Sequence, residues 1–198
     1  MFYINKETEL NVELLQKMIN RFRINVEPRL NKYKNYYDGI QAILNKSYAD
    51  ESKPCSRTVI NYCKNIVDSY CGYLATPGHI SYKSQDDIEE VMSILKYNDY
   101  QAQDSDFLLD ALVYGVACEL MYIDASGHTR FRLINPTSCF GVYDDSLTGD
   151  LMYFVRMYKV NDWDNSDTYN VDVYSDFDVK HYKMSGTNGY LQFVKDEP

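Results

Sequence analysis

The carboxylates of the central region are the side chains of this sequence that could most readily carry out catalysis or bind a metal ion. Asp104, Asp106 and Asp110 stand close together, and three such groups could hold a divalent metal ion that activates water for hydrolysis. They also stand at the start of a predicted helix, where the helix dipole stabilises carboxylates without any catalytic role. We prefer the structural interpretation and keep a metal-dependent hydrolase as the alternative.

Two further acidic groups have structural explanations of the same kind. The run DDIEE at residues 86–90 opens another predicted helix, where acidic side chains suit the positive end of the helix dipole. Asp144 and Asp145 stand in a predicted turn, where aspartate commonly bonds its own backbone. Neither group is expected to be catalytic.

The run DWDNSD, which begins at Asp162, starts like a calcium-binding loop. Asp167 stands where such a loop requires glycine, and Val173 occupies the position of the closing glutamate. The calcium pattern therefore fails, and a solvated hairpin loop is the interpretation.

The five cysteines are odd in number and contain no C-x-x-C pair, so we expect reduced thiols rather than a disulfide framework. Cys63 and Cys71 both stand in the run NYCKNIVDSYCGYLATP at residues 61–77. On one helix they would be roughly 12 Å apart, too far to share a zinc ion or form a disulfide. We expect them to act as small apolar core residues on the helical stripe Ile60, Cys63, Val67, Cys71 and Leu74.

The three histidines, His79, His128 and His181, stand far apart in the sequence. We interpret them as solvent-exposed or edge-strand residues rather than catalytic bases. The sequence also lacks G-x-G-x-x-G, a P-loop lysine, H-E-x-x-H and G-x-S-x-G. We therefore predict no catalytic residue, no metal site and no cofactor.

The net charge of −9 is unevenly distributed. Residues 1–64 hold 11 Lys and Arg against 7 Asp and Glu, a balance of +4, and the remainder holds 9 against 22, a balance of −13. A mainly acidic chain is a poor candidate for tight binding to nucleic-acid backbones. The basic side chains Lys17, Arg21, Arg23, Arg29, Lys32 and Lys34 could still contact DNA or an acidic partner, although ordinary solvated helix faces explain them better.

Tyrosine is unusually common, with 20 residues against one tryptophan. Its apolar ring and polar hydroxyl suit protein interfaces and half-buried sheets equally well.

The first part of the chain has helical periodicity. Apolar spacing predicts a helix over residues 9–23, a second that restarts at Glu27-Pro28 and stops near Gly39, and others over 86–100 and from 101 to about Gly115. The polar stretch 45–56 is predicted to be a loop, and HISYK at residues 79–83 is expected to be strand-like.

From about residue 117 the pattern changes to short strand-like runs separated by turn signals. The fold class expected is α+β, with residues 1–116 mainly helical and residues 117–198 mainly antiparallel β. No apolar stretch approaches the roughly 20 residues of a membrane-spanning helix, and MFYINKETEL lacks the features of a signal peptide. A cytosolic setting is therefore expected.

Several stretches, taken in order, resemble the portal proteins of tailed bacteriophages, in the branch typical of long-tailed phages of Gram-positive hosts. YYDGIQAIL resembles the family's segment of a tyrosine pair, a glycine and aliphatic residues, and INYCKNIVDSYCGYL resembles a helix of the family's wing region. The matched residues are Tyr36, Tyr37, Gly39, Asn61, Ile66, Val67, Asp68, Gly72 and Tyr73.

The later run LVYGVACELMYIDASGHTRFRLINPTSCFGVYDD resembles the helix-to-sheet passage of the same wing region, and LMYFVRMYKV resembles the strand that follows. The matched residues are Tyr114, Gly115, Tyr122, Pro136, Tyr143, Asp144 and Arg156.

The resemblance implies that residues 1–198 form a single portal wing-like domain, in which the helix after Asn61 belongs to the core. The stem, clip and C-terminal parts of portal proteins are not matched, so we expect a fragment that is monomeric or weakly associated.

The resemblance also implies a structural role without covalent chemistry. Portal subunits form a ring of about a dozen copies at one vertex of the capsid, assembled in the host cytoplasm, through which double-stranded DNA passes. The implied partners are other copies of the chain, the terminase large subunit, scaffolding, major capsid and head-completion proteins, and no membrane. An unrelated phage adaptor domain is a further alternative.

Overall fold

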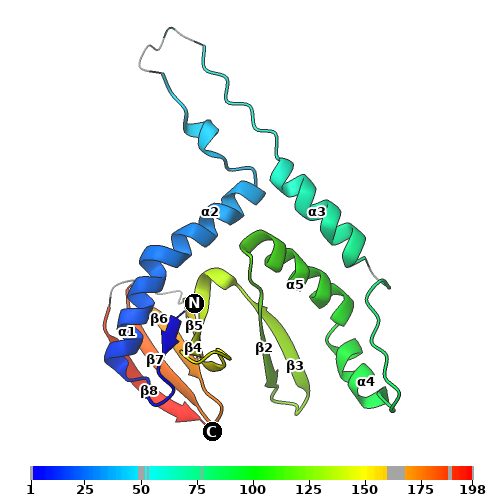
Figure 1. Ribbon diagram of the computed structural model, residues 1–198, viewed down its shortest axis with the longest axis vertical. Helices are drawn as coiled ribbons and strands as arrows, with labels where there is room; N and C mark the ends of the chain where they lie inside the picture. The colour runs from blue at the N-terminus through cyan, green and yellow to red at the C-terminus, as the bar shows by residue number, and fades with distance from the viewer. Residues whose placement is uncertain are drawn as a thin grey trace. The chain divides into compact units, whose positions relative to one another are not determined.

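The structure is a computed structural model that describes residues 2–48, 52, 54–76, 78–159, 168–186 and 189–197. Helices dominate the first part of the chain and strands the second (Figure 1). The predicted α+β class is confirmed. The backbone forms two compact units: Met1–Pro28 with Thr137–Pro198, called unit 1, and Arg29–Pro136, called unit 2. The single domain expected from the sequence stays a prediction.

Unit 1 is built on a six-stranded sheet with the order β1-β4-β5-β6-β7-β8. The first strand is parallel to β4, and all later neighbours are antiparallel. The strands are β1 Phe2–Ile4, β4 Cys139–Asp144, β5 Leu151–Lys159, β6 Thr168–Tyr174, β7 Val179–Ser185 and β8 Leu191–Glu197.

Alternation of apolar residues explains why these segments are strands and which face they bury. Val155 on β5 is opposite Val173 on β6, and Met157 is opposite Val171; all four side chains are buried. Successive strand residues point to opposite faces, so these side chains gather on one face of the sheet.

The helix α1 (Val12–Arg21) covers the buried face of this sheet (Figure 1). Asn11 caps it, because its side-chain oxygen accepts a hydrogen bond from the Leu14 N–H at 2.8 Å. A π-helix, Phe22–Val26, and then α2 (Glu27–Tyr37) follow along the chain. The ring of Phe22 stacks on Phe140 at 5.1 Å between centroids, so the core of unit 1 joins the helix to the sheet.

Unit 2 contains the remaining helices and a two-stranded hairpin. A 3-10 turn, Ala42–Asn45, follows α2, and α3 (Tyr62–Leu74), α4 (Glu89–Tyr97) and α5 (Tyr100–Tyr114) come next. The hairpin pairs β2 (Cys118–Ile123) with β3 (Thr129–Ile134) in antiparallel register. The helical part ends at Tyr114 and the strands resume at Cys118, close to the predicted boundary.

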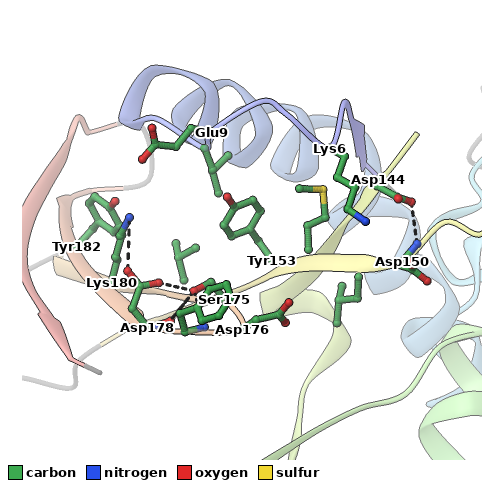
Figure 2. Close-up of a pocket in the computed structure, with 15 residues that line it drawn as sticks. Lys6, Glu9, Asp144, Asp150, Tyr153, Ser175, Asp176, Asp178, Lys180 and Tyr182 are labelled. Carbon is green, nitrogen blue, oxygen red and sulfur yellow. Dashed lines mark hydrogen bonds and ion pairs between the residues drawn. The ribbon is translucent and has the colours of Figure 1, made fainter. Parts of the chain in front are cut away.

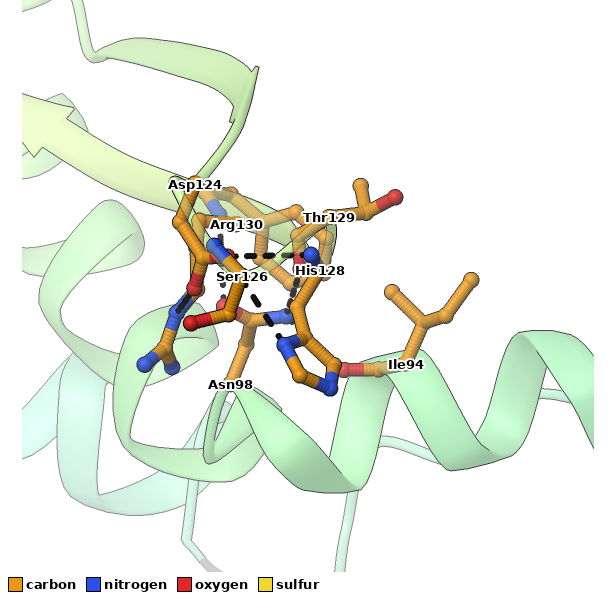
Figure 3. A network of polar contacts seen from close by, with 8 residues as sticks. Ile94, Asn98, Asp124, Ser126, His128, Thr129 and Arg130 are labelled. Atoms are coloured by element: carbon orange, nitrogen blue, oxygen red, sulfur yellow. Dashed lines mark hydrogen bonds and ion pairs between the residues drawn. The ribbon is translucent and has the colours of Figure 1, made fainter.

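A buried amide ties the end of α4 to the hairpin of unit 2 (Figure 3). The side chain of Asn98 donates hydrogen bonds to the carbonyls of Ile94 at 2.8 Å and Thr129 at 2.9 Å, and accepts one from the Phe131 N–H at 3.3 Å. Asp124 orders the adjoining turn by accepting bonds from the backbone N–H groups of Ser126 and His128. These backbone hydrogen bonds, with Arg130, hold the pKa of Asp124 below its usual value.

One local prediction from the sequence is wrong, and one strand was not predicted. HISYK at residues 79–83 forms no strand; instead the hydroxyl of Tyr82 donates to Asp104 on α5 at 3.0 Å. The strand β1 was missed, because it has only three residues and pairs with β4 far along the chain.

Some expectations lie wholly or partly outside the described residues. The run DWDNSD is among them, as are residues 49–51 and 53 of the predicted loop. Among the described helices, none is both long enough and apolar enough to cross a membrane.

We predict that Phe22→Ala lowers the free energy of unfolding by about 3–5 kcal/mol, because it removes a buried ring and leaves a cavity. Ile24→Ala, in the same π-helix but at a side chain that is 73% exposed, should change it by less than about 0.5 kcal/mol. Urea unfolding followed by circular dichroism measures both. Equal effects would contradict the packing described for Phe22.

Candidate interaction surfaces

Three of the residues that match portal proteins, Tyr37, Gly39 and Asn61, meet where α2 ends and α3 begins. Asn61 caps α3, because its side-chain oxygen accepts a hydrogen bond from the Lys64 N–H at 3.0 Å. The nitrogen of the same amide donates to the carbonyl of Tyr37 at 2.7 Å. One side chain therefore fixes the first turn of α3 to the last residue of α2, and we call this contact the Asn61 joint.

Gly39 has a backbone conformation that the joint requires. Its φ of +82° lies in the left-handed region, and a Cβ at this position would meet the Asn61 amide nitrogen at 3.2 Å. Glycine alone adopts this conformation at low cost. The glycine of the matched segment thus lets the chain leave α2 beside Asn61.

Tyr37 makes a second link between the two helices. Its hydroxyl donates to Asp68 at 2.8 Å, and the ammonium groups of Lys34 and Lys64 lie 5.3 and 5.5 Å from its ring centre. Burial, together with the hydrogen bond to Asp68 and its charge, raises the pKa of Tyr37 to about 12. The phenol stays neutral and keeps donating to the carboxylate at physiological pH.

The outward face of α3 carries large apolar side chains that the described chain does not cover. Tyr62, Ile66, Tyr70 and Tyr73 follow helical spacing along one face, and we call them the α3 stripe. Ile66 is 57% exposed and Tyr73 is 78% exposed. Both belong to the residues that match portal proteins.

The predicted role of α3 as a core helix is wrong for the chain by itself. No residue of α3 is buried, Cys63 is exposed, and Ile60 and Leu74 are also largely exposed. Cys71 and Val67 are half-buried. Periodicity identified an apolar helix correctly, but it did not show that its own chain leaves much of that helix uncovered.

Several other matched residues of unit 2 have structural roles or stay exposed. Tyr114 is buried at the end of α5, and Gly115 stops that helix with a φ of +75°. Pro136 is fully buried at the start of a 3-10 turn. Gly72 and Tyr122 lie exposed on α3 and β2.

The matched residues of unit 1 lie on β4 and β5. Asp144 is only 1% exposed and closes the turn between these strands, because it accepts hydrogen bonds from the Asp150 N–H at 2.8 Å and the Ser146 hydroxyl at 2.7 Å. Asp144 was expected within the turn and is instead the last residue of β4, but it bonds the backbone of the turn as expected. The ring of Tyr143 lies 6.1 Å from Tyr3, and Arg156 lies over the ring of Tyr158 at 4.4 Å.

The central carboxylates do not converge on one point. Asp104 accepts a hydrogen bond from the hydroxyl of Tyr82. Burial raises the pKa of Glu119, and the charge of Asp104 raises it further. Burial and the charge of Asp106 raise the pKa of Asp110. All three aspartates lie beyond the first turn of α5, so the expected dipole explanation is wrong. No group of three possible metal ligands occurs among the residues that the structure describes.

The histidines differ from one another. His79 and His128 are exposed, as expected. His181 is not on an edge strand, since β7 lies between β6 and β8. Its Nδ1 lies 2.7 Å from a carboxylate oxygen of buried Asp172. Strand order, which the sequence could not supply, explains the difference.

An acidic groove is present in unit 1 and was not predicted. It has a volume of about 620 Å³ and lies between the segment that joins β1 to α1 and the turns of the sheet (Figure 2). Its charged side chains are Glu9, Asp144, Asp150, Asp176, Asp178, Lys6 and Lys180. The sequence could not reveal this site, because its residues come from three separate stretches of the chain.

Most of the basic side chains singled out in the sequence have partners within their own unit. Lys17 pairs with Glu13 at 2.6 Å, and Lys34 pairs with Asp38 at 2.9 Å. Arg23 lies over the ring of Tyr169 at 4.9 Å. These contacts favour the solvated-face interpretation over a continuous DNA-binding patch.

We predict that Asp68→Asn lowers the pKa of Tyr37 toward the ordinary value of 10.0, because the charge that opposes ionisation is lost. A pH titration by NMR with tyrosine labelled at Cζ measures this, and Tyr37→Phe identifies the signal. The wild-type phenol contributes stability below about pH 10 that is lost as the pH rises toward about 12. Asp38→Asn is the matched control, since Asp38 contributes least to the shift. An unshifted wild-type Tyr37 would contradict the link to α3.

The comparisons with known proteins agree with the matched residues described above. The family of phage portal proteins described as SPP1 Gp6-like matches residues 23–198 of the chain. This range includes the Asn61 joint, the α3 stripe and the strands β2 to β8. No curated protein is matched. The chain therefore belongs to the SPP1 Gp6-like family of phage portal proteins.

Proposed function

We propose that this protein is a structural subunit of the portal ring at one vertex of a phage capsid. Double-stranded DNA would pass through the ring during genome packaging and ejection. The family match over residues 23–198 supports a portal role. The chain acts by binding its neighbours, and the energy for DNA movement comes from the terminase that docks on the ring.

The α3 stripe is the observation that carries this proposal. Exposed apolar patches on soluble proteins mark interaction sites, and tyrosine is enriched at protein interfaces. Two members, Ile66 and Tyr73, match the family while remaining exposed in the isolated chain. Burial of these side chains against a neighbouring subunit would explain why they are exposed in the isolated chain.

The Asn61 joint suits this role because it fixes the helix that carries the stripe. Rigid presentation reduces the conformational entropy that is lost when an interface forms. The hydrogen bonds of Asn61 and Tyr37 hold α3 at its N-terminal turn and near its middle. The joint would therefore present the stripe in one orientation to every neighbouring subunit.

The other partners follow from the same role. The terminase large subunit, scaffolding protein, major capsid protein and head-completion proteins would contact the ring, which would be assembled in the host cytoplasm and retained in the virion. DNA would pass without sequence-specific contacts. The net charge of −9 supports this, because a negative surface does not retain a polyanion.

We predict rings with a central hole when the product of the complete reading frame is viewed by negative-stain electron microscopy. The double variant Ile66→Ser with Tyr73→Ser should lose the rings, because it removes apolar area from the α3 stripe. Its thermal unfolding should be nearly unchanged, since neither side chain is buried.

Leu147→Ser is the matched control, because Leu147 is fully exposed on the turn between β4 and β5. It should leave ring formation unchanged. Absence of rings from the wild-type protein would contradict the portal proposal. Rings formed equally well by the double variant would exclude the α3 stripe from the interface.

A further inference from the structure

The acidic groove of unit 1 has an apolar interior. Leu10, Val173 and Tyr182 line it and are buried, and the ring of Tyr153 points into its middle (Figure 2). At its rim, the side chain of Phe177 is 89% exposed. The groove thus offers aromatic and aliphatic surface that an inserted side chain could cover.

Carboxylates outnumber ammonium groups around this interior. Five acidic side chains line the groove against two lysines, Lys6 and Lys180. Asp178 already bonds Ser175 and lies 3.6 Å from Lys180. Asp176 forms no ion pair with any described residue, so negative charge remains for an incoming group.

These properties define the chemistry of the occupant. A cationic side chain would neutralise the excess carboxylates, and an adjacent aromatic ring would cover Phe177 and Tyr153. Nucleic acid is a poor occupant, because its phosphates would oppose the carboxylates. The groove therefore fits a protein segment that places basic and aromatic residues on one face.

The outer face of α2 carries that combination. Arg29, Lys32, Tyr33 and Tyr36 follow helical spacing and share one face, which we call the α2 face. Arg29, Lys32 and Tyr33 are exposed, and neither basic residue forms an ion pair with the described part of the chain. With a rise of about 1.5 Å per residue, the face is about 10 Å long.

Two other side chains of α2 are already used within the chain. Leu30 is buried, and Tyr37 bonds Asp68. The two tyrosines of the matched pair therefore differ: Tyr37 holds α3, whereas Tyr36 belongs to the α2 face. Tyr36, which is half-buried, is therefore the tyrosine that can serve a contact outside the chain.

We propose that the α2 face of one copy docks into the acidic groove of the next copy around the ring. The contact is head-to-tail, which is the type of contact that closes a ring of identical subunits. Lys32 and Arg29 meet the carboxylates near Asp176, and Tyr33 covers the apolar interior. This inference rests on the proposed ring but goes beyond it, because it assigns both halves of one subunit contact.

A carbodiimide, which joins amines directly to carboxylates, tests the pairing in the protein from the complete reading frame. Rings are assembled from an equal mixture of ¹⁴N- and ¹⁵N-labelled chains, and mass spectrometry identifies the joined peptides. The expected product links Lys32 to Asp176 between chains of different label. A link found only within single chains would overturn the proposal.

Charge exchange gives the specific control. Lys32→Asp and Asp176→Lys should each abolish the product and weaken assembly about tenfold, because like charges then oppose one another. The variant with both substitutions should restore assembly and a link of reversed polarity. Lys83→Asp, at another exposed lysine of unit 2, should change neither. Failure of the exchange to restore assembly would overturn the pairing.

The outcomes separate this inference from the proposed function. Wild-type rings without the product overturn only the contact between the α2 face and the groove. Absence of rings overturns both. If a short DNA duplex blocks modification of Lys32 while the rings remain intact, the α2 face is a nucleic-acid surface and the pairing is wrong.

Discussion

The side-chain amide of Asn61 is the interaction on which the arrangement of unit 2 depends. It accepts a hydrogen bond from the Lys64 N–H in the first turn of α3 and donates one to the carbonyl of Tyr37, the last residue of α2. Losing it would therefore remove both contacts together. The helix α3 needs this support, because none of its residues is buried. Its position comes from polar contacts at its first turn and near its middle, and from packing against α5.

That constraint explains a division among the residues that match portal proteins. Tyr37, Gly39, Asn61 and Asp68 are used within the chain to fix α3. Ile66 and Tyr73 are displayed by the helix that those residues hold. The residues that match the family therefore form two groups, one that holds α3 within the chain and one that α3 exposes. Holding α3 in place serves a function only if the exposed residues bind a partner.

Much of the fold could be predicted because its signals are local. Short strand-like runs separated by turn residues located the strands from Cys118 onward, and Pro28 and Gly39 indicated the start and end of α2. The exposure of α3 could not be predicted in the same way. The helical spacing of Cys63 and Cys71 indicates an apolar face, but it does not show whether another part of the chain covers that face. The strand β1, the setting of His181 and the acidic groove all depend on contacts between distant segments, which no local pattern encodes.

Electron cryomicroscopy of the assembled protein tests the central claim most directly. The account predicts that the side chains of the α3 stripe, including Ile66 and Tyr73, are buried against another subunit while the Asn61 joint keeps the geometry described here. A ring in which this face of α3 remains in solvent would contradict the account.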